Sequence, residues 1–358
     1  MEYRNLGRSG LKVSPLCLGT MLFGAQTDAP TSRRIIDRAR EAGVNFIDTA
    51  DSYNEGRTEE LVGAAIRGTR GEWVLATKLG HPMGKGANDR GLSRSWIFRA
   101  AEASLRRLGT DVIDVYYLHK EEHETPLEET VLAMAELMRQ GKIRYFGVSN
   151  YRSWRVAEIC NLCDRFSIAR PIASQPYYNA VNRMPETEHL PACGYYGLGA
   201  VPYSPVARGI LTGKYAPDSP PPTGTRASRQ DGRIMQTEWR RESLEIAQQL
   251  ARYAEKRGLT PGQFAVNWVI NNRFVTAAVA GPRTEEQWAD YLGALRHRFT
   301  PEDEALVDSL VVPGHPSTPG YNDPMYPIEG RVPRTAWTDD RRSPSESRAN
   351  ERAQGFPR

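Results

Sequence analysis

The chain has 358 residues, of which 39% are hydrophobic and 25% charged, and its mean hydropathy is -0.57. This composition is typical of a globular protein with a large core, and α/β barrels reach this length as one domain. We find no run of about eighteen apolar residues and no apolar stretch of a secretory signal at the start. We therefore expect a cytoplasmic protein with no membrane partner.

The net charge of +4 is concentrated in the last part of the chain. Residues 331–358 hold seven arginines against four acidic residues, which leaves residues 1–330 with a net charge of +1. A nucleic-acid-binding surface requires clustered basic residues. We therefore expect no nucleic-acid partner.

Four cysteines are too few and too scattered for a disulfide framework in so long a chain. Cys160 and Cys163 have the C-x-x-C spacing of redox motifs, but they lie within a helical pattern of apolar residues. Redox pairs lie at a helix N-terminus, where the thiolate is stabilised. We interpret both residues as part of a buried helix face.

The elements begin with a hairpin around Gly7-Arg8-Ser9-Gly10, followed by alternating strands and helices. Short apolar runs predict strands at 16–19, 44–48, 73–78, 113–119, 143–148, 172–175, 198–203 and 275–280. Helical spacing predicts helices at 31–42, 58–66, 93–108, 127–140, 154–166, 186–192, 239–257, 261–271 and 284–295.

Eight strands followed by helical segments predict a (β/α)8 TIM barrel with an N-terminal β-hairpin and a long C-terminal tail. No G-x-G-x-x-G motif follows the first strand, so the usual dinucleotide-binding fingerprint is missing. We assign residues 1–310 to the barrel and residues 311–334 to a loop packed near the active site. Residues 335–358 have almost no apolar content, and we expect this tail to be disordered.

Polar residues end three successive predicted strands: Asp48, Lys78 and His119. Tyr53 follows in the loop after Asp48. Each residue also has a structural interpretation, since a strand-end Asp caps helices, Lys is usually solvated and a single His is often structural. Together at one rim of a barrel they favour an active site.

These four side chains suit the reduction of a carbonyl group. An ammonium close to a phenol lowers the pKa of the phenol, and a carboxylate keeps that ammonium charged. Tyr53 would then be the general acid, with Lys78 and Asp48 behind it and His119 as a donor to the carbonyl oxygen. We expect no chemical role for Asp51. Side chains cannot deliver a hydride, so a nicotinamide cofactor is implied.

The motifs in this order resemble the aldo-keto reductases over nearly all of residues 1–330, in a pattern related to the reductase-like β subunits of potassium channels. The resemblance is carried by G-V-N-F-I-D-T-A-D-S-Y (43–53), T-K (77–78), Y-L-H (117–119), G-V-S-N (147–150), Gln175, P-Y-S-P (202–205) with Gly209 and Leu211, and G-P-R-T-E-E-Q (281–287).

The resemblance implies a catalytic tetrad of Asp48, Tyr53, Lys78 and His119 with bound NADPH or NADP+. The cofactor contacts that it implies come from three regions: Gly19, Thr20 and Met21; Ser149, Asn150, Gln175, Tyr203, Ser204, Pro205, Val206, Arg208, Gly209 and Lys214; and Gly281, Arg283, Gln287 and Asp290. Arg208 or Lys214 would supply charge at the pyrophosphate, and Arg283 with Gln287 would hold the 2′-phosphate. Relatives often carry an Asn after an acidic residue, whereas this chain has Asp290-Tyr291, which leaves the adenine contact open.

The resemblance further implies an NADP-dependent aldo-keto reductase that reduces a small-molecule carbonyl, namely an aldehyde or ketone of moderate size with bulky or xenobiotic carbonyls included, to the alcohol. The alternative is an NADPH-binding redox-sensing subunit of a larger assembly, with only incidental turnover. We expect a monomer or a homo-oligomer. His119 and His123 have the spacing of a zinc pair, but His119 ends a strand and no H-E-x-x-H motif is present, so we expect no metal.

Overall fold

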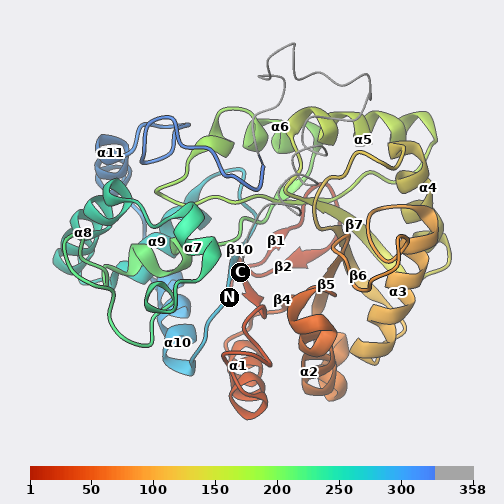
Figure 1. Cartoon of the computed structure of the whole chain (residues 1–358), viewed down its shortest axis with the longest axis horizontal. Coiled ribbons are helices and arrows are strands. Elements are labelled where there is room, and N and C mark those ends of the chain that lie inside the picture. Colours follow the sequence, from red (N-terminus) through yellow and green to blue (C-terminus); the bar gives the residue numbers. More distant parts are fainter. Residues whose placement is uncertain (327–358) are drawn as a thin grey trace.

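The computed structural model describes residues 1–326, so the predicted tail at 335–358 and part of the predicted loop at 311–334 lie outside the described residues. Eight parallel strands form one sheet in the order β10-β3-β4-β5-β6-β7-β8-β9, with the helices around it (Figure 1). The strands are β3 (Leu16–Gly19), β4 (Phe46–Asp48), β5 (Val74–Leu79), β6 (Ile113–Leu118), β7 (Ile143–Ser149), β8 (Ala173–Gln175), β9 (Gly199–Ala200) and β10 (Ala278–Ala280).

The sheet closes on itself between its first and last strands. Isolated parallel bridges join Ala200 to Val275 and Tyr203 to Val279, next to β9 and β10. The predicted (β/α)8 barrel is therefore confirmed. The predicted N-terminal hairpin is also present as β1 (Arg4–Asn5) and β2 (Lys12–Val13), which pair antiparallel.

The helices agree with the predicted ranges to within a few residues at most of their ends. They are α1 (Ala29–Glu41), α2 (Arg57–Ile66), α3 (Arg94–Leu108), α4 (Leu127–Arg139), α5 (Ser153–Arg165), α6 (His189–Tyr196), α8 (Arg241–Lys256), α9 (Pro261–Asn271) and α10 (Glu285–Gly293). Within residues 1–326, no helix is long and apolar enough to cross a membrane.

Two helices are absent from our prediction. The short α7 (Gly232–Thr237) lies in the long loop after β9, where the segment is too polar to show a helical period. The helix α11 (Pro301–Leu310) has a clear start signal that we overlooked. Thr300 caps it in a capping box with Asp303, and Pro301 occupies its first turn.

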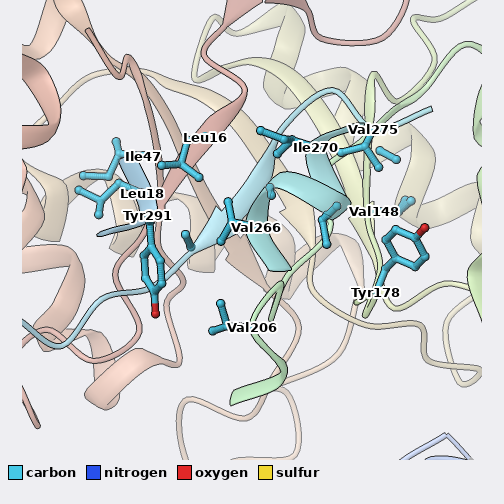
Figure 2. Packing of buried hydrophobic residues seen from close by; sticks show 14 of the residues in the cluster. Leu16, Leu18, Ile47, Val148, Tyr178, Val206, Val266, Ile270, Val275 and Tyr291 are labelled. Atoms are coloured by element: carbon cyan, nitrogen blue, oxygen red, sulfur yellow. The ribbon is translucent and has the colours of Figure 1, made fainter. Parts of the chain in front are cut away.

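Alternation along the strands divides the core into two layers. Phe46, Ala76 and Val115 point into the barrel interior, whereas Ile47 and Leu75 point outward to the helices. Figure 2 shows part of the outer layer, where Leu16 and Leu18 of β3 lie beside Ile47 of β4. The C-x-x-C cysteines belong to this outer layer: both are free and buried on α5, as predicted.

Candidate active site

The same alternation places the predicted site residues in the last layer of the barrel interior. Asp48 follows the inward-facing Phe46 by two residues, and Lys78 follows Ala76 in the same way. His119 continues the inward register of β6, and Gln175 that of β8. Parallel strands end at one rim, so residues far apart in sequence meet there.

Lys78 is the central residue of this layer. Its side chain is fully buried, and its Nζ donates to Oδ1 of Asp48 in a close ion pair. Nζ also lies 2.7 Å from the carbonyl oxygen of Thr49 and 3.2 Å from the hydroxyl of Tyr53. All three hydrogens of the ammonium therefore have an acceptor.

The ionisation of this group of residues is set by burial and by the ion pair. Burial opposes the charge on Lys78, but Asp48 and Tyr53 raise the pKa of the ammonium above its ordinary value. Burial raises the pKa of the Tyr53 phenol, and this effect exceeds the lowering by Lys78. Our expectation of a lowered phenol pKa is therefore wrong in its net direction, because we considered only the charge and not the desolvation. Tyr53 remains a protonated phenol at neutral pH.

His119 lies beside the phenol as an uncharged imidazole. The ring centroids of Tyr53 and His119 are 5.9 Å apart in an edge arrangement, and His81 contacts His119 on another side at 4.6 Å. Burial, with the nearby charges of Lys78 and Lys120, lowers the pKa of His119 well below its usual range. A neutral ring keeps one N–H donor, which suits hydrogen bonding to a carbonyl oxygen.

A chain of hydrogen bonds joins the predicted nicotinamide residues to this centre. Gln175 donates from Nε2 to Oδ2 of Asp48 at 3.0 Å, and the Ser149 hydroxyl donates to the Gln175 carbonyl at 2.9 Å. Asn150 has a left-handed backbone (φ 57°) and donates to the carbonyl oxygen of His119 at 3.0 Å. Tyr203 donates its hydroxyl to Oδ1 of Asn150 at 2.9 Å. The structure thus brings all four residues together.

The long loop after β9 and the turn after β10 contribute the cations Lys214, Arg229 and Arg283. Within residues 1–326, no ion pair joins Lys214, Arg229 or Arg283 to an acidic residue. Arg229 and Arg283 both donate to the carbonyl of Gly224, at 2.8 Å and 3.0 Å. Burial and then the charges of Arg283, Arg226 and Arg229 lower the pKa of Lys214. Such an uncompensated group of cations fits the phosphates of a dinucleotide.

Two predicted cofactor residues are engaged elsewhere. Arg208 is buried and its Nε lies 3.1 Å from the buried carboxylate of Glu238, so its charge is already neutralised. Of the two residues that we considered for the pyrophosphate, Lys214 is therefore the better placed. Asp290 accepts a hydrogen bond from the Thr260 hydroxyl at 2.7 Å, at the start of α9.

The remaining predicted contacts line the same rim. Thr20 donates its hydroxyl to the Asp48 carbonyl at 2.9 Å, and the side chain of Met21 is 44% exposed. Gln287 accepts from the amide of Arg283 at 2.7 Å, which ties the start of α10 to the cation group. The others are at the strand end (Gly19), in the turns after Tyr203 (Ser204, Pro205, Val206, Gly209) and after β10 (Gly281).

Three features of the site were not predicted. The carbonyl oxygen of Thr49 that accepts from Lys78 is a backbone atom, so the identity of residue 49 does not indicate this contact. The neutralisation of Arg208 by Glu238 joins residues on separate turns of one long loop. The contact of His81 with His119 had a signal, because His81 begins the loop after the strand that carries Lys78.

Fold and site together define a barrel protein whose C-terminal rim holds a buried lysine–carboxylate pair against a protonated phenol. A group of cations without acidic partners within residues 1–326 accompanies this centre. Sequence comparison agrees with this class: the Aldo/keto reductase family matches residues 15–312. The chain belongs to the aldo/keto reductase family, as predicted, and is an oxidoreductase of a family that generally uses NADP(H) and small carbonyl substrates.

Several curated relatives match nearly the whole chain. The "Probable voltage-gated potassium channel subunit beta" of Oryza sativa subsp. japonica is 36% identical over 87% of this chain and 97% of its own length. The protein of the same name from Arabidopsis thaliana is 37% identical over 82% of this chain and 91% of its own. The "Uncharacterized oxidoreductase YrpG" of Bacillus subtilis (strain 168) is 39% identical over 87% and 96%.

Proposed function

We propose that this protein is an NADPH-dependent reductase that converts an aldehyde or ketone to the alcohol, with Tyr53 as the general acid. One observation carries the proposal: the Tyr53 hydroxyl lies 3.2 Å from the Lys78 ammonium, which is itself held by Asp48. A protonated phenol backed by a buried cation is suited to release a proton as negative charge develops on an oxygen nearby.

Each of the four residues has a separate task in this proposal. NADPH, when bound, supplies the hydride to the carbonyl carbon. Tyr53 donates its proton to the carbonyl oxygen, and Lys78 stabilises the phenolate that results. Asp48 keeps Lys78 charged inside the barrel, and the neutral His119 donates a hydrogen bond that orients the carbonyl.

The cofactor would lie across the rim between the amide network and the cation group. Ser149, Asn150 and Gln175 would hold the carboxamide of the nicotinamide, and Tyr203 would face the ring. Lys214 would contact the pyrophosphate. Arg283, with Gln287 behind its backbone, would bind the 2′-phosphate and so favour NADPH over NADH.

The substrate pocket would lie above Tyr53, between Met21 and the C-terminal segment. Asp323 of that segment pairs with Arg233 at 2.7 Å. Burial raises the pKa of Tyr203, and the nearby Tyr326 and Asp323 raise it further. Both segment residues therefore lie near the rim. This supports a role for residues 311–326 in covering the site. The exposed, flexible Met21 suits carbonyl substrates of moderate or large size.

The alternative, a redox-sensing subunit, draws on the potassium-channel name of two relatives. The decisive experiment follows NADPH consumption by absorbance with 4-nitrobenzaldehyde, together with NADPH binding by fluorescence titration. We expect turnover. NADPH binding without any turnover would reject the reductase proposal and favour the subunit.

A further inference from the structure

The turn that carries Tyr53 also carries a buried acid, Asp51. The Asp51 side chain is 1% exposed, and neither of its carboxylate oxygens has a hydrogen-bond partner within residues 1–326. Its backbone amide donates to the carbonyl oxygen of Lys78 at 3.1 Å. Asp51 is therefore tied to the residue that holds Tyr53, although its side chain takes no part in the tetrad.

The groups around Asp51 lie on the outer face of the sheet, opposite the barrel interior that holds Lys78. Thr77 of β5 points outward and donates to Oε1 of the fully buried Glu59 on α2 at 2.5 Å. Arg107 of α3 donates to the other oxygen of Glu59 at 2.7 Å. Tyr116 on β6 belongs to the same cluster, since burial and then Asp51 and Glu59 raise the pKa of its hydroxyl.

This buried cluster contains two carboxyl groups and one guanidinium, and the guanidinium is bonded to Glu59. A second carboxylate charge would have no partner in a site without access to water, and burying an unpaired charge is costly. Asp51 must therefore be protonated in the folded protein at neutral pH. Burial and then Glu59 raise the pKa of Asp51 to about 8, against the opposing effects of Arg107, of the nearby backbone N–H of Ser52 and of Lys78.

The turn between β4 and α2 requires support, because its backbone is strained. Asn54 and Glu55 have left-handed backbones, with φ of 49° and 56°. Asn54 fixes the outer side of the turn by donating to the carbonyl of Phe23 at 2.9 Å. The inner side of the turn is held at Asp51, whose side chain is buried in the cluster.

We propose that Asp51 is a positioning residue whose uncharged side chain, packed behind the sheet, holds the turn that presents Tyr53 to the substrate. The inference rests on the proposed function. An ionised Asp51 must reach water, and any outward movement of residue 51 shifts Tyr53, two residues later, away from Lys78. A misplacement of about 1 Å costs up to about a hundredfold in rate.

The consequence is a loss of reduction at alkaline pH through a group that never touches the substrate. Ionisation of Tyr53 or Lys78 does not explain a loss of activity near pH 8, because the pKa of each group is raised above its ordinary alkaline value. Reduction by the wild type should therefore fall as Asp51 ionises, with binding of NADPH unchanged.

The test compares the wild type with Asp51→Asn and Asp51→Ala over about pH 6 to 10, as kcat/KM for 4-nitrobenzaldehyde. Asn has the shape of the protonated acid, so Asp51→Asn should keep the neutral-pH rate and lack the loss near pH 8. Asp51→Ala should lose about tenfold to a hundredfold in kcat at every pH, because the buried side chain that packs behind the turn is removed. The exposed Asp111→Asn is the matched control.

Urea unfolding supplies a measurement that does not depend on turnover. Folded Asp51 retains its proton to a higher pH than the unfolded chain does, so the contribution of Asp51 to wild-type stability falls as the pH rises from about 4 to about 8. Asp51→Asn should remove this decline. If Asp51→Asn loses reduction at alkaline pH as the wild type does, or shows the same decline in stability, the positioning role of Asp51 is rejected and the proposed function is not affected. Absence of reduction at every pH would reject the proposed function and, with it, the positioning role.

Discussion

Gln175 donates from Nε2 to one carboxylate oxygen of Asp48, whose other oxygen accepts from Lys78. The carboxylate is therefore held from two strands that lie far apart in the barrel, β8 and β5. This bidentate arrangement fixes the position of the ammonium and, through it, of the Tyr53 hydroxyl. The proposed chemistry depends on this order, since a buried charge pair is stable only when its remaining lone pairs are satisfied.

Tyr53→Phe should abolish most of the reduction while cofactor binding remains. The variant loses only the hydroxyl that is proposed to donate the proton, and general acids contribute about 10² to 10⁴-fold. NADPH consumption measures the loss, and fluorescence titration measures binding. Tyr145→Phe, on the first half of β7 and away from the rim, is the control. An active Tyr53→Phe variant would remove Tyr53 from the role of acid.

Much of the site could be predicted from the sequence, because period-two alternation and strand order are local properties. Asp48, Lys78 and His119 each end an apolar run, and a parallel barrel brings such ends to one rim. The net pKa direction of Tyr53 could not be predicted, because desolvation depends on packing between distant segments. Nor could the sequence indicate that Arg107, the guanidinium of the buried cluster, pairs with Glu59. The carboxyl group of Asp51 is thereby left without a cationic partner.

Lys78→Met should destabilise the fold more than the loss of a surface charge would. Removal of the ammonium leaves Asp48 buried and unpaired, which costs about 3–5 kcal/mol. The double variant Asp48→Asn/Lys78→Met should regain part of this stability, because no charge is then left unpaired. Urea unfolding without cofactor provides the measurement. If the two single losses simply add in the double variant, the two residues are not coupled as the structure indicates.

Arg283→Ala should weaken NADPH much more than NADH. A charge-assisted hydrogen bond contributes about 1.5–3 kcal/mol, so the NADPH affinity should fall about tenfold to a hundredfold. NADH lacks the 2′-phosphate and should be affected little. Fluorescence titration with both cofactors gives the ratio, and the exposed Arg296→Ala serves as the control. Equal losses for the two cofactors would exclude a 2′-phosphate contact.

His189 of α6 should contribute a loss of stability in mild acid. Its Nε2 lies 2.8 Å from the hydroxyl of Ser174 on β8, and burial lowers the pKa of His189 to about 4. At His189 the unfolded chain takes up a proton below about pH 6.5 and the folded chain only near pH 4, so the contribution of this residue to stability falls as the pH decreases through this interval.

For one such histidine, the loss between neutral pH and about pH 5 is about 2 kcal/mol. His189→Gln retains a side chain that can reach Ser174 but cannot take up a proton. Between neutral pH and about pH 5 its unfolding free energy should therefore rise by about 2 kcal/mol relative to that of the wild type. Urea unfolding at both pH values measures the difference, with the exposed His315→Gln as the control. An equal acid loss in His189→Gln and wild type would show that His189 is not the group responsible.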